Sequence, residues 1–565
     1  MKERKNSTAA VANYVIGLDF GTDSVRALLV DIHTKREIVA VENYPRWSQG
    51  YYCHASETQF RQHPTDYMEC MEKALLHVID QCDKPHAIGA ISIDSTASTP
   101  CLVNRNLTPL SLSPEYESDP DAMFILWKDH TAQAEADEIT RLCATSPWNY
   151  ARHSGNNYSA ECFWAKVLHI LRRNERLRRD AWIPLELCDW IPALLTGCRD
   201  VQHLRSSHCV AGAKLMWAPE WGGYPPSGFF ATLEPALAQM AERMPQETYA
   251  CGTSAGRLSP EWARRLGLSE DVVVGVGNID SHSGAVGAGI CDGTMVLNLG
   301  TSACYMAVMP TDRYDGHIID GLFGQVENYI LPDRIGFEAG LSAFGDVYAW
   351  FKRILTWPLH QLHTDNAANC TEYIEQQETE MLFRLGQAAR QLPLREDAPL
   401  ATDYLNGRRS PWPCSTLKST LAGLTLATTA PELYYALVEA TAFATRVIVD
   451  HLKTNGVTIE RLIGIGGISQ KSPFVMQTLA DVLGMELSVA DCMHACAQGA
   501  VIHASVAAGI YHSVEEAQQT LAARPSTVYR PDVSKSKILM RRYARYRELG
   551  GLPKVNLELQ TDNNR

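Results

Sequence analysis

Hydrophobic runs alternate with polar turns along the first hundred residues of the chain. The runs are short and rich in Val and Ile, and each stops at a cluster of Gly, Asp, Ser or Thr, as strands do. One segment instead carries apolar residues at helical spacing behind a Pro-Thr start. We expect strands at residues 14–18, 25–32, 37–43 and 88–93, and a helix at residues 66–81. Such alternation predicts an α/β domain whose ligand site lies beyond the carboxyl ends of its strands.

The same pattern returns after a long middle region. Residues 114–267 are rich in Trp, Pro and polar side chains and predict a less regular elaboration of the first domain. Beyond them we expect strands at residues 272–274, 295–299, 304–308, 461–465 and 485–489, and helices at residues 431–452, 472–483 and 497–508. The chain therefore reads as two α/β halves, at residues 13–288 and 289–548.

The two halves share an opening. Each begins with a strand, a turn that contains Gly-Thr, and a second strand; the turns are Gly21-Thr22 and Gly300-Thr301. Each half later has a strand that ends in small polar residues, at 94–96 and at 466–469. A duplicated α/β unit with an active cleft between its copies fits this arrangement.

Composition narrows the class of protein. A chain of 565 residues predicts two domains or more, and 45% hydrophobic with 20% charged residues is typical of a globular protein. The formal net charge of -13 argues against nucleic acid as the main partner, but a single anionic ligand needs only a local site. The first twelve residues hold no apolar secretory core, and no apolar run is long enough to cross a membrane. We expect a cytoplasmic protein.

The 16 cysteines contain no Cys-x-x-Cys pair. The closest two, Cys492 and Cys496 with His494 between them, have no second ligand group at zinc-site spacing. Scattered thiols predict buried, reduced side chains rather than a metal centre.

The two Gly-Thr turns have the residue types that a phosphate-binding site needs. Glycine lets the backbone approach an anion, and the hydroxyls and exposed N–H groups of 21–24 and 300–302 can donate to it. Asp19, just before the first turn, could hold Mg²⁺ through water. Either turn alone could also be an ordinary hairpin; together, one at the head of each half, they favour phosphate binding.

Other glycine-rich segments are weaker. The chain has no Walker-type loop, and no Gly-x-Gly-x-x-Gly follows a strand. Residues 464–467 could let an adenine base lie against the backbone, or they could form a plain turn.

Asp280 is the candidate catalytic base. It lies among small residues in 275–287, where a substrate can reach it, and phosphoryl transfer needs a group that takes the hydroxyl proton. The alternative is an aspartate that caps a small-residue helix. His282 could compete for the role of base, although a histidine there is more often structural.

With Asp19 to Ser24, Asp280, Gly300 to Ser302 and Gly466-Gly467 in that order, the chain resembles the FGGY carbohydrate kinases. The likeness runs from about Asn13 to Tyr511 and implies two actin-like, ribonuclease H-like domains of the sugar kinase/actin/Hsp70 superfamily with a catalytic cleft between them. Segments such as Leu126 to Thr131 and Asn406 to Arg409 are most similar to the L-ribulokinase branch of bacterial arabinose catabolism.

The resemblance implies a role for each matching position. Asp280 would be the base for the terminal hydroxyl of the sugar, with Mg²⁺ and ATP as cofactors. The phosphates would contact Gly21, Thr22, Ser24, Gly300, Thr301 and Ser302. Adenosine would contact Gly466, Gly467, Lys471, Phe474 and Gly499. The sugar would contact Thr96, Trp127, Asp129, Lys214 and Glu338. The residues after Gly467 depart from the family pattern, which leaves the adenosine contacts open. The implied reaction is ATP-dependent phosphorylation of L-ribulose to L-ribulose 5-phosphate. The implied enzyme is cytoplasmic, and a homodimer is one oligomeric state open to it.

Three alternatives stay open at this point. The acceptor could be another ketopentose or a pentitol, such as D-ribulose, ribitol or xylulose. The chain could be an actin- or Hsp70-like ATPase module, which shares the Gly-Thr turns but does not predict a sugar-facing set such as Lys214 and Glu338. A catalytically inactive sugar sensor is the third, and the presence of Asp280 argues against it.

Overall fold

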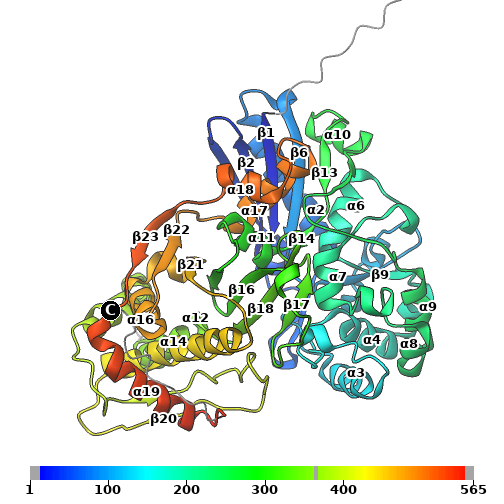
Figure 1. Ribbon diagram of the computed structural model, residues 1–565. Coiled ribbons are helices and arrows are strands. Elements are labelled where there is room, and N and C mark those ends of the chain that lie inside the picture. Colours follow the sequence, from blue (N-terminus) through cyan, green and yellow to red (C-terminus); the bar gives the residue numbers. More distant parts are fainter. Residues whose placement is uncertain (1–12, 362–366, 554–565) are drawn as a thin grey trace, which may run out of the picture. The chain divides into compact units, whose positions relative to one another are not determined.

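The computed structural model describes residues 13–361 and 367–553, which fold into two compact units (Figure 1). Unit 1 contains the chain up to Val296, together with Met306–Glu338 and Ala490–Arg524; unit 2 contains Leu297–Tyr305, Ala339–Val489 and the chain from Pro525 onward. The compact units thus differ from the continuous halves expected from the sequence, because segments late in the chain return to unit 1. The first twelve residues, for which we expected no secretory signal, lie outside the described residues.

Every strand and helix expected above is present in the structure. The bounds differ from the expected ones by at most two residues, and the strands at 37–43 and 461–465 have the expected bounds. Local pattern was therefore sufficient to find the elements that carry the candidate chemistry.

Unit 1 is built on a mixed sheet. Its strands are ordered β12 (Ser254–Arg257), β13 (Val273–Gly275), β6 (Ile88–Ser95), β1 (Tyr14–Phe20), β2 (Ser24–Asp31) and β3 (Glu37–Asn43), with β14 (Asn278–Ile279) also on β6. The strand β1 pairs antiparallel with β2 and parallel with β6, and all seven of its residues are buried. Strands covered on both faces become continuous apolar runs, as the sequence shows here.

Helices α2 (Pro64–Asp80), α11 (Asp280–Gly287) and α17 (Ala495–Ala507) cover this sheet, with α17 packed on β1, β6 and α11 (Figure 1). The approach is close enough to require glycine. A Cβ on Gly17 would lie 2.1 Å from the Ala497 carbonyl oxygen, and a Cβ on Gly499 would lie 1.9 Å from the Ser283 carbonyl oxygen. Side chains at these positions would force the helices apart.

The middle region is more regular than expected, because α-helices make up nearly half of it. It contains α3 (Gln133–Thr145), α4 (Phe163–Arg173), α5 (Glu175–Asp180), α6 (Leu187–Thr196), α7 (His208–Lys214), α8 (Ser227–Leu233), α9 (Pro235–Arg243) and α10 (Pro260–Leu266). These helices are short, and Trp164, Trp190 and Trp262 are fully buried in them. The aromatic residues that made the sequence look irregular are therefore core residues.

Unit 2 is built on the second large sheet. The order of that sheet is β17 (Gly324–Glu327), β18 (Arg334–Leu341), β16 (Ala303–Pro310), β15 (Thr294–Leu299), β21 (Arg461–Ile465), β22 (Leu487–Ala490) and β23 (Pro525–Tyr529). All of β17, residues 306–310 of β16 and residues 334–338 of β18 belong to unit 1. The long helix α14 (Ala430–Thr454) begins with a capping box between Thr429 and Glu432, and α16 (Pro473–Leu483) packs on it. The structure adds α12 (Gly345–Gln361), α13 (Ala367–Arg390) and α19 (Ser536–Leu549), which the sequence pattern did not indicate.

Across the described residues, no helix combines the length and apolar character that crossing a membrane requires.

Candidate active site

The first Gly-Thr turn is a tight hairpin between β1 and β2. The Gly21 amide donates to the Ser24 carbonyl oxygen at 3.0 Å. Two side chains hold Thr22 from outside: Trp127 Nε1 donates to its hydroxyl at 3.0 Å, and Gln62 Nε2 donates to its carbonyl oxygen at 2.7 Å. These hydrogen bonds fix the backbone conformation of the hairpin. A hairpin fixed in this way can donate hydrogen bonds to phosphates without rearranging.

Asp19 lies at the end of β1, just before this hairpin. It is 4% exposed, and Arg26 Nη1 donates to its Oδ2 at 2.9 Å. Arg26 was not among the residues expected from the sequence. Its guanidinium also lies 3.0 Å from the position a Cβ on Gly21 would take, so a cation sits directly against the hairpin.

Three carboxyl groups gather at the carboxyl ends of neighbouring parallel strands. Asp19 of β1 is paired in register with Asp94 of β6, Asp94 is paired with Asn278 of β14, and Asp280 follows that strand. Asp94 is fully buried; burial first, and then the charges of Asp19 and Asp280, raise its pKa well above the usual range. Asp94 is thus a neutral acid next to two functional candidates. The sequence pattern pointed to the segment 94–96 but assigned no role to Asp94 itself.

Asp280 opens α11 and is partly exposed. Its Oδ1 accepts a hydrogen bond from the Ser281 amide at 2.6 Å. Burial, followed by repulsion from Asp19, raises its pKa to about 7, while the Ser281 amide opposes the shift. A carboxyl group with this pKa is half ionised near neutrality, where a general base works best. The helix-capping alternative does not explain this placement, because the N-cap of α11 is Ile279.

Two of the expected sugar-binding residues lie together. Lys214 Nζ of α7 is 3.7 Å from Glu338 Oε2 of β18, and the two residues are 3% and 5% exposed. Thr96 follows β6; its amide donates to the Phe20 carbonyl oxygen, and its hydroxyl lies 3.0 Å from that of Thr99. All three residues belong to unit 1, the unit that contains Asp280.

Asp129 has extensive contacts within the chain. It is 0% exposed and forms a buried ion pair with Arg61. Its Oδ2 also accepts from the Phe60 amide, and its Oδ1 accepts from the amide and hydroxyl of Thr131. A carboxylate whose two oxygens are occupied in this way connects loops, which argues against the sugar contact expected for it.

A buried lysine supports the same region. Lys166 of α4 is 0% exposed, and its Nζ donates to the carbonyl oxygens of Ser98 and Leu126 at 2.6 and 2.9 Å. These carbonyls belong to the segments that carry Thr96 and Trp127. The contacts span 68 and 40 residues of sequence, so no local pattern could have found them.

The second Gly-Thr turn lies in unit 2 and resembles the first. The Gly300 amide donates to the Ser302 carbonyl oxygen at 3.0 Å, and Thr301 is exposed. The turn after β21 lies beside it: Gly466 has φ +88°, and a Cβ there would lie 2.6 Å from the Leu299 carbonyl oxygen. Only glycine fits this position, so the close approach of the two turns depends on it. Gly467 next to it is exposed.

The remaining expected adenosine residues are spread over both units. Lys471 is exposed, and the Phe474 ring packs at a tilt against the ring of Tyr435, with 5.2 Å between centroids. Gly499 belongs to unit 1, and its packing against Ser283 explains why it must be glycine. This packing explains the glycine without a nucleotide, and the adenosine contact of Gly499 stays a prediction.

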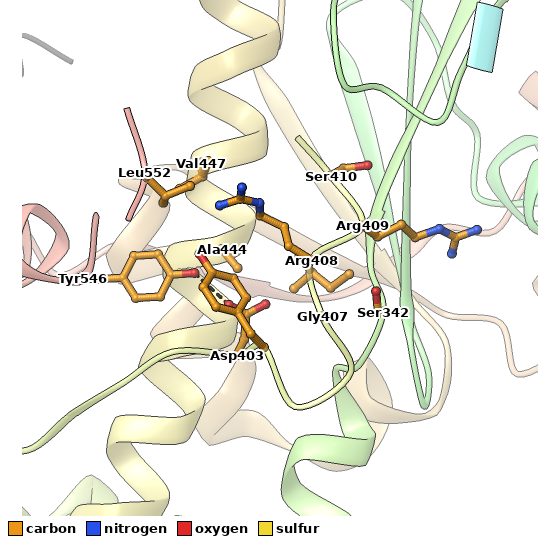
Figure 2. A pocket seen from close by; sticks show the side chains of 12 residues that line it. Ser342, Asp403, Gly407, Arg408, Arg409, Ser410, Ala444, Val447, Tyr546 and Leu552 are labelled. Carbon is orange, nitrogen blue, oxygen red and sulfur yellow. Dashed lines mark hydrogen bonds between the residues drawn. The ribbon is translucent and has the colours of Figure 1, made fainter. Parts of the chain in front are cut away.

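Gly407, Arg408 and Arg409, from the segment that carried part of the resemblance, line a small pocket in unit 2 (Figure 2). Figure 2 shows Tyr546 beside Asp403, and the Tyr546 hydroxyl donates to Asp403 Oδ1 at 2.7 Å. Burial raises the pKa of Asp403 to about 6. Arg408 and Arg409 both line this pocket, and the Arg409 side chain extends away from Asp403 in this view.

Comparison with known proteins places the chain in a class. The models of the N-terminal and C-terminal domains of the FGGY family of carbohydrate kinases match residues 14–287 and 295–508. The chain belongs to the FGGY family of carbohydrate kinases, and it is an ATP-dependent sugar kinase. The family resemblance drawn from Asp19 to Ser24, Asp280, Gly300 to Ser302 and Gly466-Gly467 is confirmed.

Two relatives with similar sequences are ribulokinases. The chain is 42% identical over 541 residues to a ribulokinase of Vibrio parahaemolyticus, with 95% of each chain covered. It is 34% identical over 542 residues to a ribulokinase of Bacillus licheniformis, with 93% of this chain and 94% of the relative covered. The expected likeness to that branch of the family is confirmed.

Solved structures agree on the fold. A ligand-bound xylulose kinase from Lactobacillus acidophilus aligns with a TM-score of 0.73 at 18% identity, covering 95% of this chain and 97% of that one. A glycerol kinase of Plasmodium falciparum with ADP aligns with a TM-score of 0.73 at 16% identity, covering 97% and 100%. The expected fold class is confirmed.

Proposed function

We propose that this chain transfers the γ-phosphoryl group of ATP to the terminal hydroxyl of L-ribulose, giving L-ribulose 5-phosphate and ADP. The single observation that carries the proposal is Asp280, a partly exposed carboxyl with a pKa near 7, in the same unit as the buried Lys214 and Glu338. The name shared by the relatives supports ribulose as the acceptor.

In phosphoryl transfer the protein mainly positions the two substrates and stabilises the charge of the phosphoryl group. The ribulose hydroxyl oxygen forms a bond to the γ-phosphorus, the bond from that phosphorus to the β,γ-bridging oxygen breaks, and Asp280 takes the hydroxyl proton. A base whose pKa is about 7 accepts this proton at neutral pH without holding it too tightly to release it.

The two hairpins are the proposed phosphate contacts. Gly21, Thr22 and Ser24 supply backbone and hydroxyl donors in unit 1, and Gly300, Thr301 and Ser302 supply them in unit 2. Arg26, held by Asp19, adds a fixed positive charge beside the first hairpin. Gly466, Gly467, Lys471 and Phe474 are the proposed adenosine contacts in unit 2.

Asp19 is the proposed protein contact for Mg²⁺. In the described part of the chain, no group of three His, Cys, Asp or Glu side chains has the geometry of a metal site. This fits Mg²⁺, which keeps most of its waters and takes its other ligands from the phosphates, so that one carboxylate suffices. Bound with ATP, Mg²⁺ neutralises phosphate charge. Asp19 is suited to orient it because Arg26 fixes the carboxylate.

Lys214, Glu338, Thr96 and Trp127 are the proposed sugar contacts. A polyol is recognised by polar groups of both signs beside an aromatic face, and this set offers an ammonium, a carboxylate, a hydroxyl and a partly exposed indole. Asp129 is left out because its oxygens are already occupied.

A coupled assay of ADP release tests the proposal. We expect ADP release that depends on L-ribulose, and we expect Asp280→Ala to abolish it while the protein still binds nucleotide. Asp271→Asn is the matched control, because Asp271 is an exposed carboxylate whose partner Arg257 is exposed as well. An Asp280→Ala protein that turns over at near the unaltered rate would disprove the role of base.

A panel of ketoses, aldoses and pentitols, including D-ribulose, ribitol and xylulose, separates the possible acceptors. Preference for one of these over L-ribulose would replace the acceptor and leave the kinase chemistry intact.

We further propose that the enzyme works in the cytoplasm. ATP is supplied there, and cysteines that form no disulfide, as in the described part of the chain, stay reduced. The homodimer stays a prediction. Sedimentation velocity at micromolar concentration decides it, since a monomer would sediment at the mass of one 62.6 kDa chain.

A further inference from the structure

Three side chains contact the same oxygen of Glu338. Lys214 Nζ lies 3.7 Å from Oε2, His282 Nε2 lies 3.3 Å from it, and the Tyr329 hydroxyl donates a short hydrogen bond to it. All four residues are buried, and His282 is 0% exposed. A carboxylate desolvated this far needs compensating donors, and these residues supply them.

The backbone brings this cluster together from four elements of unit 1. Glu338 of β18 is paired with Gly324 of β17, and Tyr329 lies in the turn between those strands. Helix α7, which ends at Lys214, packs on β17 so closely that a Cβ on Gly212 would lie 2.5 Å from Val326. His282 comes from the first turn of α11, two residues after Asp280.

The other ring nitrogen of His282 contacts a buried thiol. Cys209 Sγ lies 3.0 Å from His282 Nδ1, and both residues are 0% exposed. Burial raises the pKa of Cys209 well above its usual range, so the thiol keeps its proton; burial lowers the pKa of His282, so the imidazole is neutral. A neutral imidazole carries one proton, on one of its two nitrogens.

The neighbours decide which nitrogen carries it. With the proton on Nε2, the thiol donates to Nδ1 and the Nε2–H group faces the Glu338 carboxylate. With the proton on Nδ1, a bare nitrogen lone pair would face the carboxylate at 3.3 Å, which is repulsive. The present contact does not meet the geometry of a hydrogen bond, so the interaction between Nε2 and the carboxylate at 3.3 Å is electrostatic. The Tyr329 ring lies edge-on to the imidazole at 4.1 Å between centroids and packs against it.

We propose that Cys209 and His282 form a positioning pair: the thiol fixes the imidazole as its Nε2–H form, and the imidazole holds Glu338 for the sugar. The inference rests on the proposed function, in which Glu338 binds the acceptor. His282 does not serve as a base here, because its two nitrogens face Cys209 and Glu338 and it is fully buried.

Two matched pairs of variants test the proposal. Glutamine places its amide nitrogen where Nε2 of histidine lies, and asparagine places it nearer Nδ1. We expect His282→Asn to raise KM for L-ribulose about tenfold with KM for ATP unchanged, and His282→Gln to restore KM for ribulose to within about threefold of the unaltered protein. We likewise expect Cys209→Ser, which keeps a donor, to resemble the unaltered enzyme, and Cys209→Ala to raise KM for ribulose several-fold.

The outcomes are distinguishable. Equal KM values for the asparagine and glutamine variants, or for the serine and alanine variants, overturn the positioning pair. Thermal melting of each variant identifies a misfolded protein, and the Cys209 pair decides the question if the His282 variants do not fold. No ribulose-dependent ADP release by the unaltered chain overturns the proposed function and this inference with it.

A spectroscopic readout tests the proton placement without turnover. Nitrogen-15 shifts of His282, assigned by their loss in His282→Gln, should report a protonated Nε2 and a bare Nδ1 in the unaltered protein and in Cys209→Ser. A protonated Nδ1 in the unaltered protein overturns the proposal.

Discussion

Replacing Asp280 by asparagine should make the protein more stable as well as inactive. An aspartate side chain has a pKa of 3.8 in an unfolded chain and about 7 in this folded protein, because burial and Asp19 disfavour its charged form. The folded state therefore binds the proton more tightly than the unfolded state, and stability falls as pH rises from about 4 to 7. Asparagine carries no charge and keeps an oxygen for the Ser281 amide.

The magnitude follows from the two pKa values. One pKa unit corresponds to about 1.4 kcal/mol, so full ionisation of Asp280 above pH 7 costs the folded state about 4 kcal/mol, and about 2 if its partial exposure relieves half of that. At pH 5 the folded carboxyl is mostly protonated, and the cost is below about 2 kcal/mol. The advantage of Asp280→Asn should therefore grow between pH 5 and pH 8.

Thermal unfolding of the unaltered protein, Asp280→Asn and Asp271→Asn at both pH values measures this difference. We expect the midpoint of Asp280→Asn to lie above that of the unaltered protein by an amount that increases with pH, and Asp271→Asn to show no such trend because its carboxylate is exposed. An advantage equal at pH 5 and pH 8, or a less stable Asp280→Asn at both, would refute the reasoning.

Three further outcomes are expected. The kcat/KM for the sugar should fall about tenfold per pH unit below pH 7, because the base must be deprotonated; a profile flat from pH 5 to 8 would exclude Asp280 as the titrating group. Lys166→Met should lower stability by roughly 2–4 kcal/mol and raise KM for the sugar, since the carbonyls of Ser98 and Leu126 lose their donor; urea unfolding and kinetics would show no change if this contact were incidental. Gly499→Ala should cost roughly 1–3 kcal/mol through its clash with Ser283, whereas Gly228→Ala, with no atom near its added Cβ, should be neutral; equal effects would disprove the packing argument.

The elements that carry the chemistry could be predicted because their pattern is local. Strand β1, the turn at Gly21-Thr22 and strand β2 follow one another in sequence, and hydrophobic runs broken by Gly and Thr indicate all three. The same holds for β15, Gly300-Thr301 and β16. The small residues around Asp280 also marked it as accessible before its pKa was known.

The supporting network could not be predicted, because it depends on pairs far apart in the chain. Cys209 and His282 are separated by 73 residues, and Lys166 and Ser98 by 68. Each of these residues, taken alone in the sequence, looks like an ordinary core or surface residue. Asp129 shows the converse: the family resemblance implied a sugar contact, and the structure shows a buried ion pair with Arg61 that the sequence did not indicate.

Helix α13 was missed for a different reason. It lies outside the motifs that guided the interpretation, and its sequence is more polar than that of helix α14, which was expected.

Analysis of the reaction product tests the central claim most directly. The purified chain is incubated with ATP, Mg²⁺ and L-ribulose, and phosphorus-31 spectra with mass analysis follow the fate of the γ-phosphoryl group. The account predicts one ribulose 5-phosphate for each ADP formed, and neither product from Asp280→Asn. A γ-phosphoryl group released as inorganic phosphate regardless of sugar, or transferred to another hydroxyl, would contradict it.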